Sequence, residues 1–512
     1  MTTEPSTTEH PTTVQHTTEH YTTEQTRRRP MTSPPVPRTT QAQILAGPTV
    51  FEDEHLLPAD QDALLQVRSR LQDTDLAAPP VVLPDFHHKS KMELPSSVAI
   101  ATRGTIRPDL TGSSVNCGMA LIALDSDDAD PAAVERFMRG VRERYPYPTK
   151  GGRELSATEV LSAAEHGAEF GADRWDLPAE ELERIEEGGR LDLEPYGGIE
   201  RLQKELPGFA VQLARFRFGT VGPSNHFVEL QRVEEVLDPE TASRLGVHEG
   251  QLTVQYHGGG GVLAGEIGRL FTRRKDYPRQ VKAVNLALKP LFHLRTARSW
   301  QALRERLDLY FTDGCPPISL DSDEGQRLML ANAAAMNYGF AFRVSTYASL
   351  RRLASECFGG GTGRLVVDSP HNSIYEEPVG DGRGVVHRHN SCRAYTADMM
   401  PAGTTFAETG QAVLLPGTHR TSSFLAVAGE HADRSLHSAC HGAGTVVSDL
   451  VRRGLSGADP QGRQTLRFRY SDAAPTDVAH YDDNGVTAAL DVLRRHELVR
   501  PVARMRPIAV LH

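Results

Sequence analysis

The sequence contains no apolar run long enough to cross a membrane and no apolar stretch near its N-terminus of the kind that directs secretion. Its five cysteines are scattered and form no Cys-x-x-Cys pair, which argues against zinc fingers and against a disulfide framework. Positive charge is also in deficit. The net charge of −10 argues against a surface that coats nucleic acid non-specifically, while a local basic cleft remains compatible with it. A protein of the reducing cytoplasm without a membrane partner is expected.

The remaining composition is that of a globular protein, with 39% hydrophobic and 24% charged residues. A chain of 512 residues can bury one large core or two to three ordinary ones. Residues 2–26 repeat with a period of five, as in TTEPS and TTEHP, and a proline-rich stretch follows to about residue 40. This segment has few apolar residues to bury, so we predict a disordered tail over 1–40, dispensable for catalysis. Ordered structure is expected to begin near ILAGPTVFEDE.

Helical and strand patterns mix after the tail. PAAVERFMRGVRERY (131–145) has helical periodicity and begins with proline, and MALIALD (119–125) and QLTVQYH (251–257) are typical of strands. Residues 323–357 predict one long helix or two, and DDNGVTAALDVLRRHELV predicts another near the C-terminus. The glycine-rich HGGGGV and FGGGTG are expected to be loops. Strands and helices alternate without regular βαβ spacing, so we predict an α+β fold with one large domain.

Five short stretches pair a histidine or cysteine with glycine, asparagine or proline, and several follow a predicted strand. They are SSVNCGM with Cys117, GPSNHFVEL with His226, QYHGGGG with His257, VVDSPHN with His371, and HSACHGAG with His441. One thiolate and several imidazoles suit a borderline or soft divalent metal. The two glycines after His441 indicate backbone drawn close to a ligand, often an anion. From spacing alone, His441 fits a metal ligand, a nucleophile or a packed core histidine.

The ordered set of motifs resembles the RtcB-type RNA ligases. The resemblance runs from LPDFHH (83–88) through VNCGM, GTVGPSNHFVEL, YHGGGG, ANAAAMNYGFAFR, DSPHN, VVHRHNSCRA, GQAVLLPGT and CHGAG to RPIAV (506–510). It therefore covers nearly everything after the tail, and NHFVE and CHGAG are its most specific blocks. It implies that residues 41–512 form one compact α+β domain, with mixed sheets and helices around a metal-containing cleft.

The resemblance also implies an activity. The family joins an RNA 3′-phosphate or 2′,3′-cyclic phosphate to a 5′-hydroxyl with GTP and manganese, as in RNA repair or tRNA splicing. By resemblance, Cys117 bridges two manganese ions, His226 binds the first ion, and His257 and His371 bind the second. His441 is the nucleophile that forms a histidine–GMP intermediate. The expected partners are RNA ends and GTP, with room for an activating protein.

Further site residues follow from the same resemblance. Arg388 and Arg393 are expected to bind RNA phosphate. The residues expected to contact the nucleotide are Asn225, Glu229, His371, Asn372, Pro416, Gly417, Thr418, His441, Gly442, Ala443, Gly444 and His512.

The chain departs from the family pattern within the site. Ser114 replaces an aspartate three residues before Cys117, and a hydroxyl is a weaker manganese ligand than a carboxylate, so the first metal site is expected to be weak. Gly261 and Thr445 replace arginines, and His389 and His512 replace lysines. Fewer cations weaken phosphate binding by roughly 1.5–3 kcal/mol for each charge-assisted contact. Arg420 and the additional histidines are candidates to compensate.

Three functions therefore remain open at this point. The chain is a GTP- and manganese-dependent RNA ligase, a divergent paralogue that binds RNA ends or metal without ligating them, or a metal-dependent phosphatase on the same scaffold. Labelling with α-labelled GTP distinguishes them, because only the first forms a covalent histidine–GMP.

Overall fold

The computed structural model describes residues 47–89, 92–112, 114–145, 154–221, 225–271, 279–311, 315–359, 361 and 363–512, with the side chains of 279–285 left out. The predicted disordered tail (1–40) lies outside these residues. Within them, no helix combines the length and apolar character needed to span a membrane.

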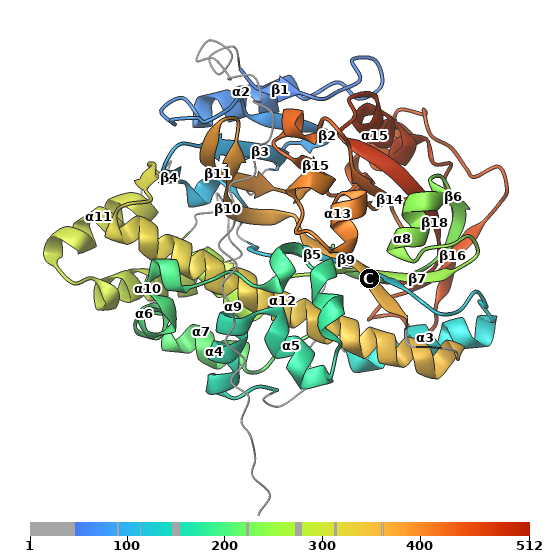
Figure 1. The fold of residues 1–512 in the computed structure, drawn as a ribbon, viewed down its shortest axis with the longest axis horizontal. Coiled ribbons are helices and arrows are strands. Elements are labelled where there is room, and N and C mark those ends of the chain that lie inside the picture. The colour runs from blue at the N-terminus through green and yellow to red at the C-terminus, as the bar shows by residue number, and fades with distance from the viewer. Residues whose placement is uncertain are drawn as a thin grey trace, which may run out of the picture.

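Two large sheets hold most of the β strands of the described residues (Figure 1). The first has five strands in the order β1-β2-β3-β11-β10, namely Thr49–Val50, Val81–His87, Ser96–Thr102, Gly382–His389 and Asn372–Val379. The second has a main path β13-β14-β18-β6-β7-β5-β9, namely Ala412–Leu415, Ser423–Ala428, Val499–Leu511, Phe227–Val236, Leu252–Gly258, Gly118–Ala123 and Arg364–Pro370. At its side, β16 (Gln464–Phe468) pairs with β18 and with β17 (Thr476–Ala479).

Most neighbouring strands are antiparallel, but β1 and β2, and β16 and β18, are parallel. Two further pairs are small: β12 (Ser391–Arg393) with β15 (Ser438–Cys440), and β4 (Thr105–Ile106) with β8 (Ile318–Ser319). The mixed sheets together with many helices confirm the predicted α+β class.

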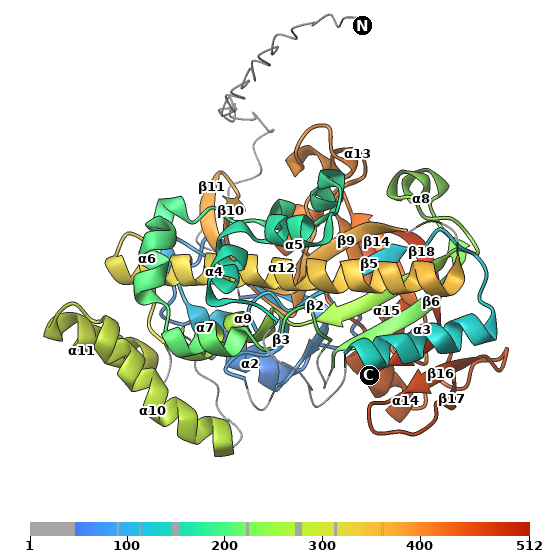
Figure 2. The same ribbon diagram turned by 90° about the horizontal axis from the view of Figure 1, so that it is seen from below.

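The helix α12 (Asp323–Phe358) is the central helical element and crosses the width of the molecule below the sheets (Figures 1 and 2). It is a single helix of 36 residues, which decides between the one or two helices that the sequence allowed. Small residues such as Ala333, Ala334 and Ala335 are buried on it and let neighbouring elements approach closely. Helices α3 (Pro131–Arg144), α4 (Ala157–His166), α5 (Ala168–Trp175) and α9 (Gly261–Phe271) pack against it.

The remaining helices cover the sheets and the ends of α12. They are α2 Gln61–Arg70, α6 Gly198–Glu205, α7 Gly208–Ala214, α8 Pro239–Leu245, α10 Arg279–Thr296, α11 Trp300–Phe311, α13 Thr405–Thr409, α14 Gly444–Arg452 and α15 Asn484–Arg495. One apolar core, around Val413, Val447 and Leu490, lies between the five-stranded sheet, strands β13 and β14 of the large sheet, and helices α14 and α15.

The local predictions agree with these elements in most places. The predicted helix 131–145 is α3, capped by the Asp130 side chain, and the strands predicted over 119–125 and 251–257 are β5 and β7 within one or two residues. The loop predicted for HGGGGV is wrong at both ends, because Gly258 still belongs to β7 and α9 already begins at Gly261.

Candidate active site

Four of the five singled-out stretches meet at one edge of the large sheet. Strands β6, β7, β5 and β9 are neighbours, and each is antiparallel to the next. Cys117 and His226 therefore stand at the beginnings of β5 and β6, while His257 and His371 stand at the ends of β7 and β9. In antiparallel neighbours, one strand's start lies beside the next strand's end, so all four side chains reach the same edge.

The three residues Cys117, His257 and His371 are close enough to share one metal ion. Their potential ligand atoms all lie within 4.8 Å of one another. Cys117 Sγ is 3.2 Å from His257 Nε2, and His257 Nε2 is 3.0 Å from His371 Nε2. His226 Nε2 lies 3.5 Å from the same sulfur. The structure thus brings together the four residues that the resemblance implied as ligands.

The tautomer of His257 fits metal binding. Its Nδ1 lies 2.8 Å from the carbonyl oxygen of Asn225, so Nδ1 carries the hydrogen and Nε2 presents a lone pair to the cluster. An imidazole that donates its other N–H to a backbone carbonyl is the usual arrangement of a histidine metal ligand. The donor set of one sulfur and three ring nitrogens fits a borderline divalent cation.

The protonation states of the cluster also suit a cation. Burial lowers the pKa of His226 to about 4 and holds the pKa values of His257 and His371 well below the ordinary histidine value. The imidazoles are therefore neutral near pH 7 and able to coordinate. Burial raises the pKa of the Cys117 thiol to about 12, so a cation that binds there displaces the thiol proton.

The turn that carries Cys117 is held by the long helix. Arg343 of α12 is fully buried, donates to Asn116 Oδ1 at 2.8 Å and forms a buried ion pair with Asp368 of β9. A side chain on Gly118 would begin 2.6 Å from the Ser369 carbonyl oxygen, which explains the glycine after the cysteine. Strands β5 and β9 can therefore approach closely enough for Cys117 and His371 to meet.

The fifth stretch brings His441 to the edge of this cluster. His441 follows β15 directly, its side chain is 18% exposed, and its ring centroid lies 4.8 Å from that of His371. Its Nδ1 lies 3.0 Å from Asp85 Oδ2, a buried carboxylate on β2 whose other oxygen accepts from Ser97 Oγ. Burial, the largest single effect, would raise the pKa of Asp85. The hydrogen bond and charge attraction with His441, together with hydrogen bonds from Cys440 and Ser97, outweigh it and hold that pKa below its usual value.

This carboxylate is the functional residue that the sequence analysis did not single out. Asp85 lies inside the matched stretch LPDFHH, but the stretch drew no role for it. The available signal was an acidic residue within the otherwise buried strand Val81–His87. A charged side chain in such a strand needs a partner, and here the partner is His441.

The residues expected to contact the nucleotide next to His441 lie on two facing segments, 416–418 and 442–444. The Ala443 N–H donates to the Pro416 carbonyl at 2.8 Å, and a Cβ on Gly444 would lie 3.8 Å from Thr418 Cγ2. Helix α14 begins at Gly444, three residues after His441, and has no side-chain cap, so its first amides have no partner within the helix. Helix N-termini with free amides favour anions.

Three other predicted nucleotide residues lie near this edge with their own partners. Asn225 is exposed. Glu229 is buried on β6, accepts from Gln231 Nε2 at 2.7 Å, and has a pKa that burial raises to about 8. Asn372 donates to the Ser114 carbonyl and accepts from the Asn390 N–H, so its amide holds two loops together.

The two arginines predicted to bind RNA phosphate are buried in ion pairs. Arg388 is 0% exposed and makes a two-pronged ion pair with Glu377 at 2.7 and 2.8 Å. Arg393 pairs with Glu187 and lies over the Tyr395 ring. In this arrangement their charges are neutralised within the protein, so phosphate binding by either one stays a prediction that requires these pairs to open.

The substituted positions also have definite surroundings. Ser114 is exposed and contributes its backbone carbonyl to the Asn372 contact. Gly261 has φ +77°, and a Cβ there would meet Phe342 and Tyr338 at 2.7 Å, so the arginine of the family cannot be accommodated without rearrangement. Arg420, a candidate to compensate for the lost cations, lies on the Tyr481 ring, and that role stays a prediction.

His512 at the C-terminal end stacks on His419, with ring centroids 5.1 Å apart and an interplanar angle of 26°. His419 directly follows the Pro416–Thr418 segment in the chain, so the stacked pair adjoins that segment. Burial lowers the pKa of His419 to about 4, and that of His512 below the ordinary value, so both rings are neutral near pH 7.

A histidine oriented by a buried carboxylate beside a cluster of thiol and imidazole ligands is the arrangement of an enzyme active site. The family profile described as tRNA-splicing ligase RtcB matches residues 72–512. The chain belongs to the RtcB family of RNA ligases.

Individual relatives agree with the profile. The chain is 27% identical to the tRNA-splicing ligase RtcB of Thermococcus kodakarensis over 500 residues, covering 93% of this chain and 96% of the relative. It is 26% identical to the Archaeoglobus fulgidus protein of the same name, covering 88% and 91%. The Mycobacterium tuberculosis RNA-splicing ligase RtcB is 28% identical, with 79% of this chain and 89% of the relative covered. The predicted family is thereby confirmed.

Proposed function

We propose that residues 41–512 form a manganese- and GTP-dependent RNA ligase that joins a 3′-phosphate to a 5′-hydroxyl, and that it acts in RNA repair or tRNA splicing. The observation that carries this proposal is the contact between Asp85 and His441 at 3.0 Å, beside the cluster of Cys117, His257 and His371. A structural metal site would not need an oriented histidine at its edge. The five free cysteines fit a cytoplasmic location.

His441 is the nucleophile in this proposal. Asp85 accepts the Nδ1 hydrogen, which leaves the Nε2 lone pair free to attack the α-phosphorus of GTP. A P–N bond forms, the bond to the β-phosphate oxygen breaks, and pyrophosphate leaves. The positive charge that develops on the imidazole faces the buried Asp85 carboxylate, which stabilises it.

The GMP group then activates the RNA end. A 3′-phosphate is a poor electrophile because its oxygens are poor leaving groups. Its oxygen attacks the phosphorus on His441, the P–N bond breaks, and an RNA 3′-phosphate–GMP anhydride results. The RNA 5′-hydroxyl then attacks the 3′-phosphorus, GMP leaves, and the hydroxyl proton passes to solvent. A 2′,3′-cyclic phosphate enters this sequence after water opens it to the 3′-phosphate.

Cys117, His226, His257 and His371 would hold the manganese, two ions if the first site forms despite Ser114. The metal supplies charge neutralisation around the phosphates when it is bound. The amides at the start of α14 and the Pro416–Thr418 segment would hold the phosphates next to His441. The stacked rings of His419 and His512 would lie toward the base. An activating protein fits this scheme as a partner.

Incubation with α-labelled GTP and manganese tests the proposal. We expect acid-labile, alkali-stable label on the wild-type protein and none on His441→Ala, with nearly equal metal content in both. Label that persists in His441→Ala would end the assignment of the nucleophile. Tight RNA binding without label would instead support a paralogue that binds without ligating, and phosphate release without label would support a phosphatase.

A further inference from the structure

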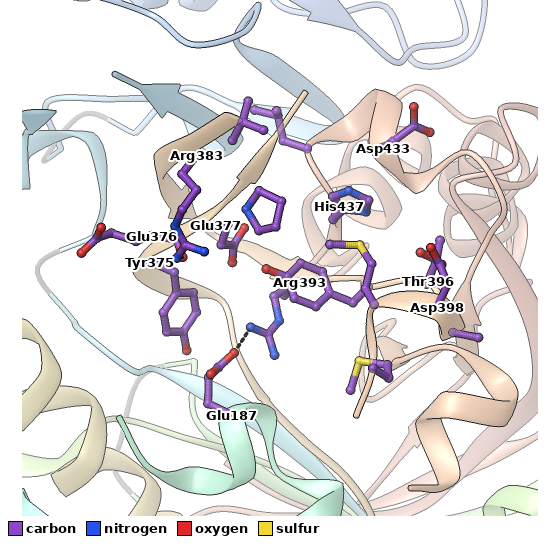
Figure 3. A pocket seen from close by; sticks show the side chains of 18 of the residues that line it. Glu187, Tyr375, Glu376, Glu377, Arg383, Arg393, Thr396, Asp398, Asp433 and His437 are labelled. Carbon is purple, nitrogen blue, oxygen red and sulfur yellow. Dashed lines mark hydrogen bonds and ion pairs between the residues drawn. The ribbon is translucent and has the colours of Figure 1, made fainter. Parts of the chain in front are cut away.

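A large cleft lies outside the cluster of candidate metal ligands and His441. Its volume is about 3570 Å³, and neither His441 nor any of the four candidate metal ligands lines it. Its lining comes from β10, β11 and β12, from the segment before α13, and from parts of residues 183–196, 329–333 and 428–437. Figure 3 shows some of the lining side chains. Small-molecule sites usually have volumes of about 300–1,000 Å³, so this cleft is of a size that suits a polypeptide segment.

The lining of this cleft is acidic. It includes eleven Asp or Glu residues and five Arg residues. Some of the carboxylates are already neutralised, as Glu187 is by Arg393 on the floor of the cleft (Figure 3). Asp398 and Asp433 are exposed, and within the described part of the chain neither forms an ion pair. The cleft therefore offers negative charge to an incoming cation.

Apolar and aromatic surface lies among these charges. Tyr196, Met399 and Met400 are half-buried in the lining, and the Tyr375 ring faces the cleft between Glu187 and Glu376 (Figure 3). Grooves that bind proline-rich segments combine aromatic side chains for the proline rings with acidic side chains for arginine. The same two kinds of group are present here.

The chain itself contains a segment of the complementary chemistry. Residues 26–40, TRRRPMTSPPVPRTT, carry four arginines and four prolines and no aspartate or glutamate. Proline-rich segments favour the extended polyproline II form, which loses little entropy on binding. The described chain begins at Gly47, which is itself part of the cleft lining. Arg38 is nine residues away, within about 30 Å of extended chain, so the segment can reach along the cleft.

We propose that residues 26–40 dock in this acidic cleft of their own chain. The arginines pair with carboxylates such as Asp398 and Asp433, and the prolines pack on the tyrosine and methionine side chains. A segment that has no core to join can still bind in this way, because the cleft supplies the surface. Strand β15 begins at Ser438, directly after the cleft residue His437, and His441 follows it, so the docked segment would lie close in sequence to the proposed nucleophile.

Limited trypsin digestion of the full chain, followed by mass spectrometry, tests the proposal. Trypsin cleaves after Arg27, Arg28 and Arg38 only when these side chains are free to enter its pocket. The test variant is Asp398→Asn with Asp433→Asn, which keeps the side-chain shapes and removes two charges. The matched control is Glu249→Gln with Asp321→Asn, which removes two exposed charges outside the cleft.

At low salt we expect the tail of the test variant to be cleaved about fivefold faster than that of the wild type, as the loss of two exposed ion pairs implies. The control should match the wild type. Raising the salt concentration should speed tail cleavage in the wild type and the control, with little further effect in the test variant. Equal cleavage rates in the test variant and the control, or a tail protected equally in all three, would overturn the proposal.

Discussion

Asp85→Asn is the change that isolates the step we assign to His441. The asparagine fills the same space on β2 but carries no charge to face the imidazolium that develops during attack on GTP. The contact with His441 Nδ1 is 3.0 Å long, and the Asp85 side chain is 1% exposed, so solvent screens it little. A charge-assisted hydrogen bond of this kind contributes about 1.5–3 kcal/mol, so guanylylation should slow by about 10- to 150-fold.

Single-turnover labelling with α-labelled GTP measures this rate directly. Metal content and the thermal melt should be followed on the same preparations, because a buried Asp→Asn change also alters the hydrogen bond from Ser97. Ser97→Ala is the matched control: it removes that neighbouring hydrogen bond and leaves the contact with His441 in place. We expect the control to retain most of the guanylylation rate.

The dependence of the free energy of unfolding on pH gives a second test of the role of Asp85. The pKa of Asp85 is lower in the folded protein than its usual value, so its stabilising contribution is present above that usual value and is lost as the pH falls through the folded pKa. Asp85→Asn should therefore lose part of the acid-induced destabilisation. A folded, metal-loaded Asp85→Asn protein that is guanylylated within threefold of the wild-type rate would refute the orienting role.

Four further predictions follow from the same structure. Cys117→Ala should lower bound manganese, measured by elemental analysis, more than any single histidine change in the cluster and far more than the control Cys315→Ala; equal metal in Cys117→Ala and wild type would refute the cluster. Ser114→Asp should reduce the manganese needed for guanylylation in a metal titration without a loss of melting temperature, because Ser114 is exposed; an unchanged requirement would count against a first metal site there. Burial raises the pKa of Glu229 from about 4.5 to about 8, so the wild type loses stability as the pH rises across this range, whereas Glu229→Gln does not. In urea unfolding, the variant should therefore gain up to a few kcal/mol relative to the wild type between these pH values. Identical pH profiles of the two proteins would contradict this prediction. Arg388→Met should destabilise the protein by about 3–5 kcal/mol in the same assay, because Glu377 is left buried without its partner; weakened RNA binding at unchanged stability would instead favour the phosphate role.

Local patterns in the sequence were sufficient for the few individual helices and strands that it predicted. The helix α3 was readable from its apolar spacing and the proline at its start, and β5 and β7 from short apolar runs. The candidate metal ligands were also recognisable, because each is a cysteine or histidine with glycine, asparagine or proline close by in the sequence. These features depend on neighbours within a few residues, which is why one sequence was enough.

The boundary of HGGGGV shows where such reading fails. Four consecutive glycines indicate a loop on local grounds, yet β7 continues through Gly258 and α9 begins at Gly261. The packing of Phe342 and Tyr338 against Gly261 requires the absence of a side chain there, and those residues lie about 80 positions later in the chain. Only Gly259 and Gly260 form the predicted loop, and the glycine at position 261 reflects a close tertiary approach.

The sequence by itself determined which side chains were available for chemistry, their order, and, through the resemblance, the family. Only the tertiary structure decided that four antiparallel strands place Cys117, His226, His257 and His371 at one edge, and that Asp85, 356 positions before His441, is its partner. It also decided that Arg388 pairs with Glu377, so that a residue expected to meet RNA lies in the interior. The physical reason is that strand pairing and the pairing of buried charges join residues far apart in the chain, and the free energy of such contacts leaves little trace in the local pattern around each one.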